Sequence, residues 1–397
     1  MGALDGLRIA DFSWVGAGPR STKDLADNGA TVIKIESRKR LDLGRMSPPF
    51  ARGERKNPDA SAFFAQTNTS KQSVTINLAD PEGVAVAKRL VAWADVVVEN
   101  FGPGYMERIG LGYDVLKTLR PDIILLSVSV AGRTGPMAGF RGYGNSAAAQ
   151  SGHAALTGWR DTPPHMPPFA YGDVTAPMFA TVAVLAALEH RERTGDGQHL
   201  DISQIEPMVH VIADLYARGG DEKPANDDPV MTPHGIYPVA GDDRWLAIAL
   251  EHEDRWPALC AALGDPALAS DARFADASAR RANSDELDQR IAALTRSREA
   301  DELWECLAAA GIAAAPALDG KSIVESEELA ASGHFVRLDH PVLGVSAMPG
   351  PPMRFSQTPP DIRRSPCLGE HNHAVFVEML GMDPADVAGL QERGALA

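Results

Sequence analysis

Short apolar runs rich in valine and isoleucine alternate with helical segments over the first 200 residues, and this alternation constrains the fold most. Five strand-like runs cover residues 7–12, 31–36, 74–78, 95–100 and 122–130. The helical segment that begins at Asp80 carries Pro81 in its first turn, where proline is tolerated. Buried strands that alternate with helices are typical of a parallel, doubly wound sheet. We therefore predict an α/β fold with a Rossmann-like parallel sheet.

The composition narrows the classes of partner and compartment. The 397 residues carry a formal net charge of −15, so a nucleic acid, which needs a basic face, is not an expected partner. Three widely spaced cysteines predict neither disulfides nor a metal cluster, and no histidine pattern predicts a metal site. The N-terminus lacks a signal-peptide pattern, and the apolar run at 176–188 is too short to span a bilayer. We expect a soluble, cytoplasmic protein that binds no membrane.

A polar stretch at 219–229 interrupts the alternating pattern and is interpreted as a linker. Beyond it, residues 234–250 have the pattern of a β-hairpin around Gly241, and amphipathic helices follow. We predict a smaller α+β domain over 231–316. The tail has scattered prolines and glycines and ends in a predicted helix near 374–380.

The segment at 129–168 is rich in glycine, alanine and proline, and long irregular segments of this kind are more often functional than idle. It precedes an apolar helix predicted over 176–193, with Thr175 as its N-cap and Gly195 just past its end. Because its first four turns are apolar nearly all round, we expect this helix to be buried. A second helix is predicted over 201–220.

The turn after the first strand invites a dinucleotide-binding interpretation. Gly16, Gly18 and the acid Glu36 copy the spacing of that motif, but Ser21 replaces its third glycine and Pro19 lies inside it. The simpler interpretation is a tight turn whose N–H groups could face an anion or a carbonyl oxygen.

A second candidate site lies where residues 98–116 leave a predicted strand. Asn100 and Phe101 end that strand at the edge where open α/β sheets bind ligands. Phe101 could stack on a flat ring and Arg108 could bind a phosphate, but the same residues also fit an ordinary strand-to-helix loop. The basic run at 38–45 fits either a polyphosphate site or a solvated surface.

Asp173 lies between a glycine and the start of the apolar helix. A carboxylate there is stabilised by the free N–H groups and dipole of a helix N-terminus, so it could be a capping acid. Thr175 competes for that role, which leaves Asp173 available as a covalent nucleophile in a site that excludes water. Spacing alone favours the cap.

Several motifs together change that balance. They are "LRIADFSWVGAGP", "GATVIKIE", "ADVVVENFGPG", "YGD" before the apolar helix, "RTGDGQHLDIS" and "CLGEHN". Almost end to end, the chain resembles the class III CoA-transferases, the family of formyl-CoA:oxalate and carnitine CoA-transferases and 2-methylacyl-CoA racemases. The resemblance implies that Asp173 attacks an acyl-CoA thioester to form a mixed anhydride, and that CoA then attacks Asp173 to form an aspartyl-CoA thioester. An acceptor carboxylate takes over the CoA through a second anhydride, so no ATP is needed.

The resemblance also implies a set of CoA and substrate contacts. These map onto Gly16, Ala17, Arg38, Ile76, Asn100, Phe101, Arg108, Arg141, Tyr143 and Gly144. Gly16 replaces the family's glutamine, so the oxyanion role of that glutamine must pass to a backbone N–H or to water. Arg38 stands in for the arginine that follows the second-strand acid, where this chain has Ser37.

The racemases of the same family are an alternative. Their catalytic His-Asp pair corresponds to Tyr143 and Gly144, so one face of the substrate lacks an evident base and the transferase is preferred. The "SWVGAG" turn resembles that of the succinyl-CoA-dependent transferases that act on aryl- or alkyl-substituted succinates, which implies succinyl-CoA as donor. A non-catalytic subunit of a heteromeric CoA-transferase is a further alternative.

The family fold implies an obligate, interlocked dimer, homomeric or heteromeric, whose large domain is built from both ends of each chain. With the composition shifts above, the resemblance predicts these domain bounds: 1–218 for the first part of the large domain, 219–230 for a linker, 231–316 for the small domain, 317–350 for a second linker, and 351–397 for the part that completes the large domain.

Overall fold

The computed structural model describes residues 2–217, 219, 223 and 225–397. They divide into two compact units. The larger unit contains residues 1–154, 166–219 and 327–397, and the smaller contains 155–165 and 220–326. Residues 155–165 thus group with the smaller unit and 327–350 with the larger one, whereas the sequence-based bounds placed them differently; those bounds stay a prediction.

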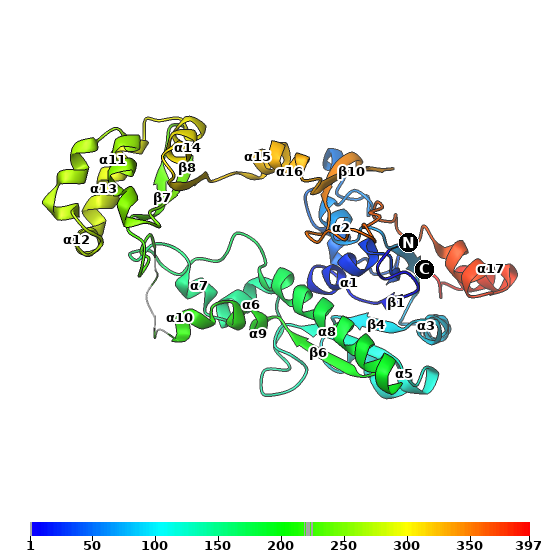
Figure 1. Ribbon diagram of the computed structural model, residues 1–397. Coiled ribbons are helices and arrows are strands. Elements are labelled where there is room, and N and C mark those ends of the chain that lie inside the picture. The colour runs from blue at the N-terminus through cyan, green and yellow to red at the C-terminus, as the bar shows by residue number, and fades with distance from the viewer. Residues whose placement is uncertain (1, 218, 220–222, 224) are drawn as a thin grey trace. The chain divides into compact units, whose positions relative to one another are not determined.

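A six-stranded parallel sheet forms the centre of the larger unit (Figure 1). Its strands are β1 (Arg8–Asp11), β2 (Thr31–Glu36), β3 (Gln72–Thr75), β4 (Val96–Glu99), β5 (Ile124–Ser129) and β6 (His199–Ser203). The spatial order β3-β2-β1-β4-β5-β6 places β1 beside β4, where the chain order reverses. Ligands of doubly wound sheets bind outside the carboxyl ends of the strands at such a point. The predicted fold class is confirmed.

Strand β6 corrects the prediction of a helix from residue 201. It pairs with β5 in parallel register, Ser129 opposite Ser203, and lies at the edge of the sheet. Its side chains are mostly half-buried, and the polar His199 and Asp201 conceal its strand character. The helix begins only at α9 (Ile205–Val211) and is followed by α10 (Ala213–Ala217).

Alternate side chains of the strands enter two separate cores, as the pleat of a strand requires. Ala10, Ile33 and Val97 face the core that α3 (Pro81–Trp93) and α5 (Tyr113–Leu119) cover. Ile9, Val32 and Val96 face the core that α1 (Ala17–Asp27) and α8 (Gly172–Thr194) cover. The two helix layers cover the two faces of the sheet. They do not cover the edge at which the parallel strands have their carboxyl ends.

The C-terminal residues complete the first of these cores. The π-helical segment Ala374–Met379 supplies Phe376, and α17 (Pro384–Glu392) supplies Val387. Figure 1 shows α17 beside α3, and Arg393 forms an ion pair with Glu82 of α3 at 2.9 Å. The Thr75 hydroxyl donates to the Leu396 carbonyl at 2.8 Å.

Helix α8 differs from its prediction in two ways. Thr175 is not the N-cap, because Tyr171 already has helical dihedral angles and the helix begins at Gly172. The expected burial holds for only one face. Ala176, Ala180 and Val184 are fully buried, whereas the opposite side carries an exposed apolar strip. That strip consists of Met178, Phe179, Val182 and Leu185, which are 41–66% exposed. By length and composition alone, α8 could also cross a membrane.

The larger unit also contains shorter elements: α2 (Ala62–Thr67), α4 (Tyr105–Arg108), α6 (Gly144–Gln150), α16 (Glu327–Ala331), β10 (Phe335–His340), β11 (Gly344–Pro349), two 3-10 helices (Leu43–Met46 and Ala51–Gly53) and α7 (His153–Leu156). The last residues of α7 pass into the smaller unit.

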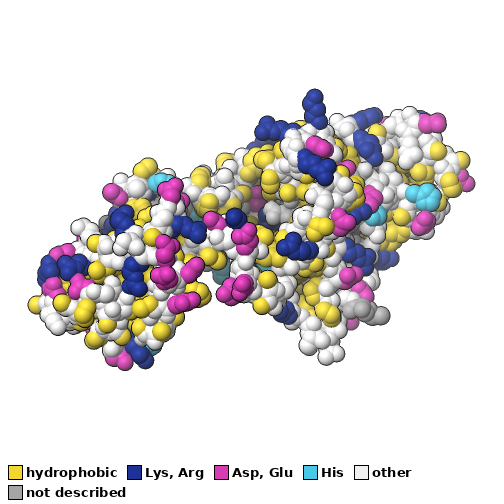
Figure 2. All heavy atoms as spheres, turned by 90° about the horizontal axis from the view of Figure 1, so that it is seen from above, with side chains coloured by type: hydrophobic (Ala, Val, Ile, Leu, Met, Phe, Trp, Pro, Cys, Tyr) yellow, Lys and Arg dark blue, Asp and Glu magenta, His cyan; other side chains and the backbone are white. Residues whose placement is uncertain are grey.

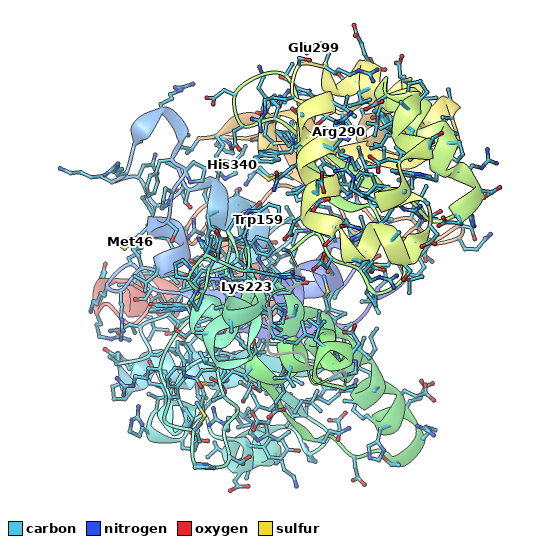
Figure 3. All side chains as sticks on the ribbon, turned by 90° about the vertical axis from the view of Figure 1, so that its left-hand side faces the viewer. Met46, Trp159, Lys223, Arg290, Glu299 and His340 are labelled. Atoms are coloured by element: carbon cyan, nitrogen blue, oxygen red, sulfur yellow. The ribbon has the colours of Figure 1, made fainter. Side chains whose placement is uncertain are left out.

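The smaller unit is an α+β structure around a three-stranded antiparallel sheet. Strands β7 (His234–Pro238) and β8 (Trp245–Ala249) form the hairpin predicted around Gly241, and β9 (Ala313–Pro316) pairs with β8. Its helices are α11 (Trp256–Leu263), α12 (Ala277–Ala282), α13 (Ser284–Thr295), α14 (Ala300–Ala309) and α15 (Gly320–Glu325). Lys223 secures the segment 155–165 to this unit, because its ammonium donates to the Pro163 carbonyl at 2.7 Å; Figure 3 labels Lys223 near Trp159 of that segment.

Candidate active site

A cavity of about 500 Å³ opens in the larger unit beyond the carboxyl ends of β1, β4 and β5. Many of the sequence-predicted site residues line it: Gly16, Ala17, Asn100, Phe101, Arg108, Arg141, Tyr143 and Asp173. They come from four separate stretches of the chain, and the sheet topology brings them together. The cavity therefore lies where a doubly wound sheet binds its ligand.

Asp173 occupies the first turn of α8, at the positive end of the helix dipole, which favours a negative charge. Its carboxylate oxygen Oδ1 accepts a hydrogen bond from the side-chain amide of Gln204 at 2.9 Å. Burial raises the pKa of Asp173 to about 6, although Arg20, Gln204 and the N–H of Gly144 each act to lower it. The carboxylate is thus ionised at neutral pH but poorly solvated.

Two glycines allow the backbone to approach Asp173 closely. A Cβ atom on Gly16 would lie 2.7 Å from Oδ2 of Asp173, and one on Gly144 would lie 2.7 Å from its backbone nitrogen. Val15, before Gly16, has a φ of 65°, which a β-branched residue rarely adopts. Its N–H donates to Asp42 at 2.8 Å, which holds the turn in this conformation.

The sequence pattern did not identify Gln204 as a site residue, because Gln204 lies inside the helix that was predicted over 201–220. It follows β6 directly, and its backbone N–H donates to the carbonyls of Ser129 and Val130 at 2.9 and 3.1 Å. The side chain is 6% exposed and lines the cavity. Its position at the carboxyl end of a parallel strand was the available signal, but that signal required β6 to be recognised.

Asn100 and Phe101 form the wall of the cavity at the end of β4. The Asn100 side-chain amide accepts from the Trp14 N–H and donates to the Trp14 carbonyl, both at 2.7 Å, so it fixes the turn that carries Gly16. The Phe101 ring lies 5.7 Å from the Trp14 ring and 4.5 Å from the Tyr105 ring, measured between centroids. These three rings offer a stacking surface.

The cavity is basic although the chain is acidic. Arg40, Arg108 and Arg141 line it, and Asp173 is its one lining acid among the described residues. None of the three guanidinium groups forms an ion pair with a carboxylate in the described part of the chain. Figure 2 shows acidic and basic side chains interspersed on the face it presents, so the charge of the cavity is a local feature. Unpaired arginines of this kind suit phosphate or carboxylate groups.

Three predicted contact residues, Gly144, Arg38 and Ile76, do not line the cavity, although Gly144 lies against Asp173. The Arg38 guanidinium donates to the Leu368 carbonyl at 3.1 Å, and Ile76 is 1% exposed within the core. Arg45 of the basic run is also not a ligand group here, because its guanidinium binds both carboxylate oxygens of Glu36 at 2.7 Å. Glu36 is thereby occupied and is not available to a ribose. Among the described residues, no group of acidic, histidine or cysteine side chains is arranged to hold a metal ion.

Comparisons with known proteins agree with this architecture. The family model described as CoA-transferase family III matches residues 4–372. The succinyl-CoA–D-citramalate CoA-transferase of Chloroflexus aurantiacus is 35% identical, over 98% of this chain and 97% of that protein. The succinyl-CoA:glutarate CoA-transferase of Mus musculus is 33% identical, over 100% and 91%. The crystal structure of a CAIB/BAIF family protein from Brucella suis superposes with a TM-score of 0.87 at 33% identity, covering 95% of this chain and 99% of that one. The chain belongs to CoA-transferase family III.

Proposed function

We propose that this family III CoA-transferase moves CoA from an acyl-CoA donor, with succinyl-CoA as first candidate, to a carboxylic acid acceptor through covalent intermediates on Asp173. The proposal depends on one observation, the environment of the Asp173 carboxylate. The carboxylate lies in a basic cavity, is ionised at neutral pH, and is desolvated enough that its pKa is about 6.

The proposed cycle begins when one carboxylate oxygen of Asp173 attacks the thioester carbonyl. A C–O bond forms, the C–S bond breaks, and CoA leaves as the thiolate. The thiolate then attacks Cγ of Asp173 and releases the donor acid, which gives an aspartyl-CoA thioester. The acceptor carboxylate displaces CoA to form a second anhydride, and the thiolate attacks the acceptor carbonyl to give the new acyl-CoA and free Asp173. A buried carboxylate is a stronger nucleophile than a hydrated one, and exclusion of water protects both anhydrides from hydrolysis.

The rest of the cavity fits the CoA part of such a substrate. Arg40, Arg108 and Arg141 offer cationic partners for phosphate groups, and Phe101 offers a ring on which an adenine can stack. The succinyl-CoA donor is proposed because two relatives at 35% and 33% identity are named for succinyl-CoA and act, by their names, with D-citramalate and glutarate. Short dicarboxylic acids are therefore the first acceptors to test.

Chemical trapping tests the proposal directly. The protein is incubated with succinyl-CoA, treated with borohydride or hydroxylamine, and digested for mass spectrometry. We expect modification at Asp173 and none there in Asp173→Asn. Full transferase activity in that variant, or a modification elsewhere, contradicts the proposal.

The same preparation separates the two alternatives. A racemase exchanges the α-proton of a 2-methylacyl-CoA with deuterated water in the absence of any acceptor acid. A non-catalytic subunit leaves Asp173 unmodified when assayed alone. We expect neither result.

We also propose that the protein assembles as a dimer. The exposed apolar strip of α8 supports this, since surfaces of this kind are normally covered by a partner. Light scattering is expected to give twice the chain mass, and Val182→Asp in the centre of the strip is expected to shift the protein towards the monomer. A monomeric parent protein contradicts this proposal.

A further inference from the structure

The two carboxylate oxygens of Asp173 have different surroundings. Oδ1 accepts the hydrogen bond from Nε2 of Gln204 at 2.9 Å. Oδ2 lies above Gly16, where even a Cβ atom would come within 2.7 Å. A side-chain donor therefore holds Oδ1, and Oδ2 faces a position without a side chain, while the N–H of Gly144 and the charge of Arg20 also act on the carboxylate.

The amide of Gln204 is held in a defined place. Its backbone N–H is bound to the end of β5, and its side chain is buried at the base of the cavity. An ionised carboxylate can only accept hydrogen bonds, so the amide nitrogen must be the atom that faces Asp173. The other amide atom, Oε1, is buried and has no hydrogen-bond partner among the described residues. A buried amide that leaves its acceptor unsatisfied while donating to Asp173 is costly to the fold, which points to a role beyond packing.

We propose that Gln204 is a catalytic residue that donates a hydrogen bond to Oδ1 of Asp173 throughout the transfer, so that Oδ2 is the attacking oxygen. This inference rests on the proposed acylation of Asp173. Position 16 is a glycine and offers no side-chain donor. In this proposal Gln204 supplies the oxyanion donor instead.

The role follows from the charge at each step. When Oδ2 attacks the donor thioester, it becomes the bridging oxygen of the anhydride, and Oδ1 becomes the carbonyl oxygen on Cγ. The CoA thiolate then attacks Cγ, and the electron pair of the Cγ=Oδ1 bond moves onto Oδ1. Collapse of this tetrahedral species breaks the Cγ–Oδ2 bond, so the donor acid leaves with Oδ2 and the aspartyl-CoA thioester keeps Oδ1. The amide of Gln204 is already aimed at the oxygen on which that negative charge develops.

The test uses Gln204→Leu, which keeps the approximate size of the side chain and removes its donor. Removal of one oxyanion donor commonly lowers kcat by about 100-fold or more, and we expect a loss of that size. The KM for succinyl-CoA should change little, because the donor acts after the substrate binds. Rapid quenching with borohydride, which reduces the aspartyl thioester, should show that its formation on Asp173 is slowed as strongly as kcat.

A second readout distinguishes this role from a structural one. The Gln204 hydrogen bond lowers the pKa of Asp173. Its removal should therefore move the acid limb of the pH profile of kcat/KM to higher pH. Gln150→Leu, at the exposed end of α6, is the matched control and should change neither kcat nor the acid limb.

Gln204→Glu guards against a folding defect in the leucine variant, because it preserves the shape of the side chain. The introduced carboxylate cannot donate when ionised, so activity should be lost at alkaline pH and should recover partly as the pH falls. If both Gln204 variants keep the parent kcat and acid limb while Asp173 is still trapped as a thioester, the inference is wrong and the proposed function stands. If Asp173 is not trapped even in the parent protein, the proposed function itself fails.

Discussion

Two aspartates lie near the carboxyl edge of the same sheet, one fully buried and one half-buried, and their surroundings are opposite. Asp11, at the end of β1, is fully buried and forms an ion pair with Lys71 at 3.0 Å. Burial alone would raise the pKa of Asp11, but Lys71, Lys34 and two hydroxyl groups more than offset it, and the pKa is lowered. Asp173 has the charge of Arg20 nearby and amide donors, but it forms no ion pair within the described part of the chain, and burial raises its pKa to about 6.

The contrast shows what separates a structural carboxylate from a candidate nucleophile in this molecule. An acid that is matched by a buried cation stabilises the fold and has little tendency to react. A desolvated acid that no buried cation pairs with is stabilised when it loses its charge, either by binding a proton or by forming a bond to an acyl group. Substitutions of the two aspartates and their neighbours test this difference, from the largest expected effect to the smallest.

Asp173→Asn should abolish catalysis without harm to the fold. Loss of a covalent nucleophile lowers kcat by roughly 10⁴-fold or more. The free energy of unfolding at pH 7 should stay equal or increase, because the substitution removes a poorly compensated buried charge. Transferase assays check the loss of catalysis, and urea denaturation checks the stability. A large loss of stability would show that Asp173 has a structural role like that of Asp11.

Lys71→Met should have the reverse effect. Removal of one member of a buried ion pair leaves an uncompensated charge, which commonly costs about 3–5 kcal/mol. We expect the urea midpoint to fall accordingly, while the remaining folded protein transfers CoA with a kcat close to that of the parent. A stable but inactive variant would contradict the division of roles between the two aspartates.

Gly16→Ala tests the free side of Asp173. The added Cβ would lie 2.7 Å from Oδ2, so the carboxylate must rotate away from its position. Misplacement of a reacting group by about 1 Å can lower kcat by roughly 100-fold. Gly6→Ala serves as a control for loss of a glycine, since no atom lies within 4 Å of a Cβ there, although its positive φ makes a small loss of stability expected. Unimpaired activity in Gly16→Ala would mean that Oδ2 is not the attacking atom.

The two aspartates should also differ in their pH dependence. The kcat/KM of the parent should fall below pH 6 as Asp173 becomes protonated. Because the pKa of Asp173 is raised in the folded state, its contribution to stability is complete below its ordinary pKa of 3.8 and is lost as the pH rises through 6. The pKa of Asp11 is lowered, so its contribution is present above pH 3.8 and is lost as the pH falls. Urea titrations from pH 4 to 8 should show that the stability advantage of Asp173→Asn over the parent grows with pH and then levels off.

Much of the larger unit could be predicted because its strands are continuous apolar runs. The parallel strands β1, β2, β4 and β5 are buried on both faces, and strands of this kind have nearly continuous apolar sequences. Strand β6 was not predicted, because it lies at the edge of the sheet and an edge strand needs fewer apolar residues. Gln204 follows β6 directly, so its place in the site was not predicted either. The start of α8 was misplaced by four residues because Thr175 is a good N-cap by type, whereas the packing of Gly172 and Gly144 determines where the helix begins.

The site was predictable only in part, for a related reason. Motifs identified Asp173, Asn100 and Phe101, and the fold brings them to one cavity. Sequence alone could not tell which charges pair with one another. Arg45 lies in a basic run that looks suited to phosphate, yet it is committed to Glu36. Such pairings depend on contacts between strands and loops that are distant in the chain.

The order in which ribosomes make this chain sets a condition on how the larger unit can fold. Phe376, Val387 and Leu396 belong to the same core as Ala10 and Ile33, so the first strands are synthesised hundreds of residues before their last packing partners. The smaller unit, whose core comes from residues 237–312, is synthesised in the interval and has all its partners available. We expect the smaller unit to fold during translation and the larger one only after the final residues have emerged. Nascent chains stopped near residue 370 should therefore expose the unfinished core to proteases and chaperones.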